Sequence, residues 1–232
     1  MKQKTLWLYD DIGFDGWTTA KVRASLNHIK NNGDIDLLDV RIASQGGSTI
    51  EMNGIIAAFD EFKQDTGVKV RAIVDVVAAS AAADIALAVS DEILTQKQAP
   101  ILVHNSWGMV IGGSEDMRSV ADEMDIVDAQ GVKLLVNKTG MTEEDAKALI
   151  KQDRLIYPEE AISLKIVDGY YVHGEVNIEL LEAYKAKLDA QKDNDETSKQ
   201  VIGEIGKTLD AHYSKQRLDK VVELRKKLGG GH

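Results

Sequence analysis

The stretch from Val68 to Val89 constrains the fold more than any other part of the chain. A β-branched run from Val68 to Val76 leads into small residues around Ser80, and an alanine-rich apolar run from Ile85 to Val89 follows. This order predicts a strand, a tight turn and a helix that begins at Ser80. The free N–H groups and the dipole of a first helical turn favour negative charge, so they suit a serine nucleophile. Capping the helix is the commoner role for a serine at this position, and this stretch alone favours it.

Strand-like and helix-like segments alternate along the first three quarters of the chain. We expect strands at 6–9, 37–43, 68–76, 92–95, 100–104 and 166–172, and helices at 18–31, after 48, at 80–89 and 114–137, after 142 and after 157. The repeated strand–helix order predicts an α/β fold with a largely parallel sheet. The helix expected at 114–137 has a 3-4 alternation of apolar residues, which suits packing on its own domain or, less simply, on another subunit.

The composition changes after Gly174. We therefore expect two domains, a globular domain over 1–174 and a charged helical extension over 175–232 with a polar linker near 191–200. Apolar residues at helical spacing between Val201 and Leu228 indicate an amphipathic helix that docks on a partner or on another copy. A solvated tail explains the same segment equally well.

Charge and composition exclude several classes of protein. The formal net charge is −10, which argues against nucleic acid as the main partner, and the chain has no cysteine for disulfides or thiolate metal sites. No apolar run has the length of a transmembrane helix, and the N-terminus lacks the apolar stretch of a signal peptide. We expect a cytoplasmic protein with no membrane contact, no metal and no cofactor.

An activated serine needs a base, a residue that orients the base, and donors for an oxyanion. Of the five histidines, His104 alone ends a β-branched strand and opens a glycine-bounded loop, although a structural histidine is the commoner case. Gly46-Gly47 follows the neighbouring strand, where it forms either an oxyanion-binding turn or a plain turn. The candidates for the orienting acid include Asp75, Asp84, Asp153 and Asp168. We expect Asp84, one helical turn after Ser80, to point away from the serine oxygen.

Four motifs occur together in a recognisable order. They are a Gly-Gly turn after a strand, Ala-Ala-Ser at a helix start, Val103-His104-Asn105, and Gln152-Asp153-Arg154 ahead of Pro158-Glu159-Glu160-Ala161. Over roughly residues 5–173 the chain resembles the ClpP-like serine proteases, the family of the Clp protease proteolytic subunit, and most of all their phage-borne prohead (head maturation) relatives. The resemblance implies a ClpP/crotonase-like fold with a handle helix from Ser114, and a homo-oligomer that forms a ring.

The resemblance also implies roles for individual residues. Ser80 corresponds to the nucleophile, His104 to the general base and Asp153 to the orienting acid. The backbone N–H groups of Gly47 and Ala81 correspond to the oxyanion hole. Gly46, Ser48 and Asn105 belong to the segments that would bind an extended peptide substrate by strand addition.

Several features depart from the housekeeping subunit that works with an ATPase. Gln45 replaces its usual proline, Ala81-Ala82 replaces Met-Gly, the N-terminal axial-loop segment looks absent, and the tail after Gly174 is long. The resulting hypothesis is a prohead protease, a serine endopeptidase of host cytoplasm whose substrate is a capsid or scaffold protein. The alternatives are an ATPase-partnered degradative subunit, a crotonase-like acyl-CoA enzyme and an inactive assembly scaffold.

Overall fold

The computed structural model describes residues 2–13, 15–172, 177–191 and 199–209. The chain divides into two compact units, Met1–Gly174 and Glu175–His232. Each unit is described by itself below.

The first unit is built on a six-stranded sheet in which every strand pairing is parallel. The strand order is β1-β2-β3-β4-β6, and β5 pairs separately with β3 near its carboxyl end. The strands are β1 (Gln3–Tyr9), β2 (Leu37–Ser44), β3 (Lys69–Ala79), β4 (Glu92–Thr95), β5 (Ile101–Leu102) and β6 (Gly169–Tyr170). The predicted α/β fold with a largely parallel sheet is confirmed.

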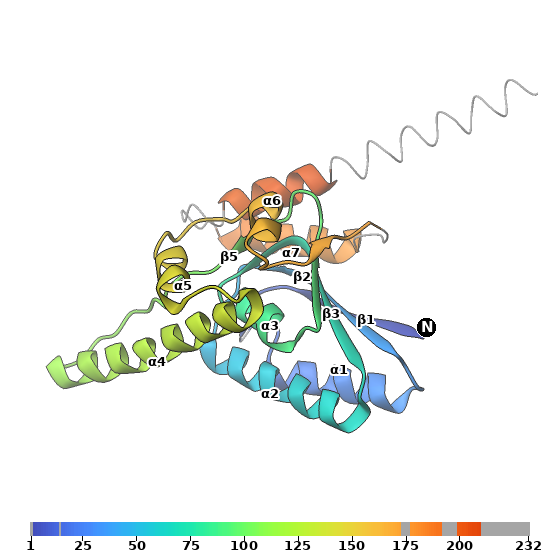
Figure 1. Ribbon diagram of the computed structural model, residues 1–232, viewed down its shortest axis with the longest axis horizontal. Helices are drawn as coiled ribbons and strands as arrows, with labels where there is room; N and C mark the ends of the chain where they lie inside the picture. Colours follow the sequence, from blue (N-terminus) through green and yellow to red (C-terminus); the bar gives the residue numbers. More distant parts are fainter. Residues whose placement is uncertain (1, 14, 173–176, 192–198, 210–232) are drawn as a thin grey trace, which may run out of the picture. The chain divides into compact units, whose positions relative to one another are not determined.

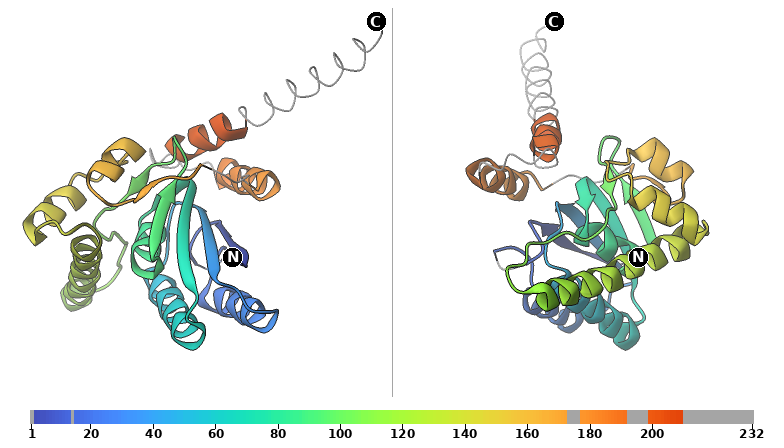
Figure 2. Two further views of the ribbon diagram at one scale, coloured as in Figure 1. Left: turned by 45° about the vertical axis from the view of Figure 1, so that its right-hand side comes forward. Right: turned by 90° about the vertical axis from the view of Figure 1, so that its left-hand side faces the viewer.

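Helices connect the strands, and α1 and α2 lie on the same face of the sheet (Figures 1 and 2). The helices of this unit are α1 (Thr19–Asn31), α2 (Thr49–Thr66), α3 (Ala81–Val89), α4 (Ser114–Thr139), α5 (Glu143–Ile150) and α6 (Pro158–Ser163). Phe59 of α2 and Ile85 of α3 are fully buried in one core cluster with alternate residues of β2 and β3, such as Val40. Each large apolar side chain that is buried in this way contributes about 1.5–3 kcal/mol.

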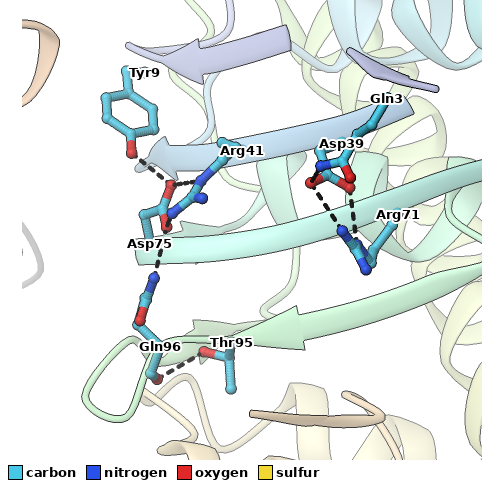
Figure 3. Close-up of polar contacts among 8 residues, drawn as sticks. All are labelled: Gln3, Tyr9, Asp39, Arg41, Arg71, Asp75, Thr95 and Gln96. Carbon is cyan, nitrogen blue, oxygen red and sulfur yellow. Dashed lines mark hydrogen bonds and ion pairs between the residues drawn. The ribbon is translucent and has the colours of Figure 1, made fainter. Parts of the chain in front are cut away.

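The opposite face of the sheet carries a buried polar network (Figure 3). Arg41 of β2 forms a two-pronged ion pair with Asp75 of β3, and the Tyr9 hydroxyl donates to the same carboxylate at 2.5 Å. Gln96 donates to Asp75 at 3.2 Å. The guanidinium of Arg41 lies 4.9 Å from the centre of the Tyr171 ring. Because all the charges are paired and hydrogen-bonded, the sheet can bury them on this face.

Helix α4 differs from what its sequence pattern favoured. Its buried residues are Val132 and Leu135, near its carboxyl end, while Ile126 is exposed and Met117 is half-exposed. The first half of α4 extends away from the sheet (Figure 1). The prediction that α4 packs on its own domain is therefore right for its second half, where Asp128 and Gln130 also bond to Ser106 and Asn53, and wrong for its first half.

Two smaller expectations also needed correction. β5 and β6 have two residues each, fewer than the strands expected at 100–104 and 166–172. Separately, Ile50 of α2 is exposed. It lies in the first turn of α2, beside the residues that build the site described below.

The second unit contains α7 (Ile178–Gln191) and a helical segment over 199–209. Leu181, Tyr184 and Leu188 of α7 are buried and follow one another at helical spacing. Most of the linker expected near 191–200 and the part of the amphipathic helix after residue 209 lie outside the described residues. In the part of the chain that the structure describes, no helix is long and apolar enough to span a membrane.

Candidate active site

Ser80 lies at a sharp turn between β3 and α3. Its φ and ψ angles are 54° and −128°, a conformation that costs a non-glycine residue on the order of 1–3 kcal/mol. Although Ser80 occupies the N-cap position of α3, its hydroxyl accepts no capping hydrogen bond. The simpler interpretation, a serine that only caps a helix, is therefore wrong. The strained turn leaves the hydroxyl free for another purpose.

The Gly46-Gly47 turn lies directly against Ser80. A Cβ atom on Gly46 would lie 2.5 Å from the carbonyl oxygen of Ala79 and 2.7 Å from the Cβ of Ser80. Gly46 also has a φ of 94°, in the region that favours glycine. Only glycine can bring the chain so close to the serine turn, so this is more than a plain connecting turn.

Two backbone N–H groups near this turn have no partner among the described residues. Gly47 forms a parallel bridge with Ile12, in which the Ile12 N–H donates to the Gly46 carbonyl at 2.7 Å and the Ser48 N–H donates to the Ile12 carbonyl at 2.8 Å. In such a bridge the N–H of Gly47 itself points away from Ile12. The N–H of Ala81 belongs to the first turn of α3, where no intrahelical acceptor exists. Neither N–H group donates a hydrogen bond to another described residue.

Strand β5 brings His104 to Ser80. Ala79 pairs with Leu102, and the Ser80 N–H donates to the Leu102 carbonyl at 2.9 Å. His104 follows Leu102 by two residues and therefore lies near the serine turn. The His104 side chain is 14% exposed, and it borders the same pocket as Ser80.

An antiparallel contact brings Asp153 to the other side of His104. Ile101 and Ile156 exchange both backbone hydrogen bonds, at 2.9 and 2.7 Å. Continuing this register by three residues places position 153 opposite position 104. Asp153 Oδ1 is 3.4 Å from His104 Nδ1, longer than a good hydrogen bond, and its side chain is 69% exposed. The structure thus brings together three residues that are far apart in the sequence.

Of the other candidate acids, Asp75 and Asp168 bind other residues, and Asp84 contacts neither Ser80 nor His104 through a polar interaction among the described residues. Asp75 is held in the ion pair with Arg41. Asp168 accepts from Ile93 N at 2.7 Å and from Lys138 Nζ at 2.6 Å. Asp84 borders the pocket of Ser80 and His104 without reaching either through a hydrogen bond or ion pair among the described residues.

The residues expected to bind substrate lie around the pocket and do not line it. Gly46 is buried behind Ser80. The Ser48 hydroxyl caps α2 by accepting from Glu51 N at 3.3 Å, a role that the sequence did not assign to it. Asn105 is exposed at the start of the loop 105–113.

The pocket beside Ser80 also holds two carboxyl groups, Asp84, which the sequence reasoning named only as a candidate orienting acid, and Asp128, which it missed. A pocket that opens to solvent lies between Ser80, His104, the start of α2, α3 and the middle of α4. Asp84 and Asp128 border this space, and burial, with a contribution from Asp128, raises the pKa of Asp84 to about 7. The spacing of four residues could have placed Asp84 near Ser80, one helical turn away. Asp128 lies too far along the chain for any spacing to indicate that it borders the same pocket. Within the described residues, no three His, Asp or Glu side chains form a cluster that could hold a metal ion.

Comparison with known proteins gives one result that decides the family. The description of the Clp protease family matches residues 1–173, which include every residue of the site described above. No curated protein matches the chain. The parallel sheet with its covering helices is consistent with the ClpP/crotonase fold that the resemblance implied. The chain therefore belongs to the Clp protease family, a family of serine-type peptidases that act on protein substrates.

Proposed function

We propose that this chain is a serine endopeptidase in which Ser80, His104 and Asp153 form the catalytic triad. The observation that carries the proposal is the position of His104, which borders the pocket of Ser80 and has its Nδ1 atom 3.4 Å from Asp153. With Nδ1 facing the acid, Nε2 is the ring nitrogen available to the serine hydroxyl.

The reaction follows from these positions. His104 Nε2 takes the proton of the Ser80 hydroxyl as the oxygen attacks the peptide carbonyl, and it then gives that proton to the departing amine. A water molecule, deprotonated by the same nitrogen, releases the acyl group and restores Ser80. Asp153 holds the ring orientation and stabilises the imidazolium. The contact of 3.4 Å fits an enzyme without substrate, in which such contacts are often long.

The N–H groups of Gly47 and Ala81 would bind the oxyanion of the tetrahedral intermediate. Both are fixed by backbone structure before the reaction, Gly47 by its bridge to Ile12 and Ala81 by the start of α3. Preorganised donors of this kind contribute about 3–4 kcal/mol each to stabilisation of the transition state. Extended substrate would lie along the Gly46–Ser48 turn on one side and Asn105 on the other.

The proposal extends to assembly and to biological setting. Trp107, Met109 and Ile111, in the loop after His104, are 82%, 87% and 92% exposed, and the adjoining half of α4 carries further exposed apolar residues. Contiguous exposed apolar residues of this kind indicate an interface, which supports a homo-oligomeric ring. Gln45, the Ala81-Ala82 pair and the long tail support a phage or prophage head maturation protease that cleaves a capsid or scaffold protein without an ATPase.

Peptidase activity is tested with purified full-length protein and an unfolded substrate such as casein, without ATP or any ATPase. We expect cleavage by the wild type and by Ser25→Ala, which changes a serine of α1 outside the pocket. Ser80→Ala and His104→Ala should lower kcat by about 10⁴-fold or more while the circular dichroism spectrum is unchanged. Unchanged cleavage by Ser80→Ala would refute the triad. Cleavage that depends on an added ATPase would refute the head maturation assignment and leave the triad intact.

A further inference from the structure

The pocket beside Ser80 is placed to receive a substrate side chain. Ser80, Ala81 and Asp84, one helical turn further along α3, all border it. Because Ala81 supplies a proposed oxyanion donor, a side chain that enters beside it belongs to the residue whose carbonyl is attacked. This step rests on the proposed function.

The interior of the pocket is acidic. The Asp84 side chain is largely buried, and it makes no hydrogen bond or ion pair with any described residue. Both hydrogen bonds of Asp128, from Ser106 N at 2.6 Å and Ser106 Oγ at 2.8 Å, go to Oδ1, which leaves Oδ2 without a described donor. None of the described residues that border the space is a lysine or an arginine.

Helix α4 leaves room for a ligand beside these carboxyl groups. Gly131, one turn after Asp128, faces Asp84, and a Cβ atom placed on it would lie 3.9 Å from both Asp84 oxygens. A longer side chain at position 131 would fill the space that the pocket keeps open.

We propose that this pocket selects substrates with lysine or arginine at the residue that supplies the attacked carbonyl, with Asp84 and Asp128 as the specificity-determining acids. A buried carboxyl group without a partner is unfavourable, and a bound ammonium or guanidinium group would provide both charge and hydrogen bonds. Burial and the nearby Asp128 raise the pKa of Asp84 to about 7, and a cation bound beside it would favour the ionised carboxylate. An apolar side chain would leave both acids unpaired, so the pocket should reject it.

The test uses fluorogenic peptides that differ only at the residue before the cleaved bond, which is Lys, Arg, Gln or Leu. At pH 8.5, where Asp84 is ionised, we expect kcat/KM for Lys and Arg to exceed that for Gln and Leu by about tenfold or more. Asp84→Asn and Asp128→Asn should each reduce this ratio several-fold. Asp125→Asn, which changes an exposed acid of α4 outside the pocket, is the matched control and should keep the ratio. A purely structural role of Asp84 or Asp128 would lower all four rates together and leave the ratio unchanged.

A second measurement needs no peptide cleavage. Benzamidine, a cation, should slow the labelling of wild-type protein by a fluorophosphonate more than the neutral benzyl alcohol does, and the difference should shrink in Asp84→Asn. Faster cleavage of the Leu peptide, an unchanged ratio in both variants, or equal effects of the two small molecules would overturn the proposal. If the fluorophosphonate labels the protein but one of these results is obtained, the specificity proposal alone fails. If the protein neither cleaves nor labels, the proposed function fails as well.

Discussion

The Asp84 carboxyl permits a test of the pocket that needs no substrate. Burial raises its pKa from 3.8 to about 7, and the negative charge of Asp128 adds to the shift. The folded protein thus keeps the neutral acid to higher pH than the unfolded chain does. Between about pH 4 and pH 7 the folded state binds more protons, so this group lowers the free energy of unfolding as the pH rises. Well above pH 7 the carboxyl is ionised in both states, and the free energy of unfolding no longer changes with pH through this group.

The size of the effect follows from the two pKa values. Ionisation of Asp84 lowers the free energy of unfolding by about 2 kcal/mol at pH 5 and by about 4 kcal/mol at pH 8. Asp84→Asn removes this titration, so the stability of the variant relative to wild type should rise by about 2–3 kcal/mol between the two pH values. The other titratable groups that border the pocket, Asp128 on α4 and His104 after β5, are present in both proteins.

The assay is urea unfolding at a single protein concentration, at pH 5 and pH 8. The Asn side chain itself changes the free energy of unfolding by an amount that does not depend on pH. This amount cancels, because the assay compares the stability difference between variant and wild type at pH 5 with the same difference at pH 8. Asp125→Asn, on the exposed face of α4, should show no such change. A difference that is equal at both pH values, or that moves in favour of wild type as the pH rises, would show that Asp84 ionises like an exposed acid and would refute the reasoning.

Three further predictions concern the serine turn, the orienting acid and the exposed loop. Gly46→Ala should abolish peptidase activity and destabilise the protein by about 2–4 kcal/mol, because its Cβ would collide with the turn at Ser80. The control is Gly33→Ala, where φ is 107° but the space is open, so that only the backbone strain should lower the stability. Equal losses of stability in chemical denaturation of the two variants would contradict this account. Asp153→Asn should lower kcat by about 10²-fold, less than for a buried triad acid, since water reaches this carboxylate; an unchanged kcat would remove it from the triad. Trp107→Ser should lower the mass measured by light scattering if the loop joins subunits, and an unchanged oligomer would exclude this side chain from the interface.

Much of the fold followed from the period of the apolar residues. Alternation through Leu38, Val40 and Ile42 identified β2, and the β-branched run before Ser80 identified β3. The two-residue strands β5 and β6 were predicted to be longer, because a run of apolar residues does not show where strand pairing stops. The exposure of α4 was also hidden, since its apolar alternation is the same whether the helix packs on its own domain or on another subunit.

The site was predictable only where a residue has a local motif. Ser80 and Gly46 follow strands in recognisable turns, and the family resemblance suggested which histidine and acid would accompany them. Neither composition nor spacing indicates that the register of Ile101 with Ile156 sets His104 opposite Asp153. The meeting of Asp84 with Asp128 depends on how α3 packs on α4, which no local pattern encodes.

The most direct test of the central claim is to react the full-length protein with a fluorophosphonate and to locate the adduct by mass spectrometry. Only a serine activated by a base reacts readily. The account predicts one adduct, on Ser80, that is lost in Ser80→Ala and forms far more slowly in His104→Ala. An adduct on another serine, or none on folded wild-type protein, would contradict the assignment of Ser80 as the nucleophile.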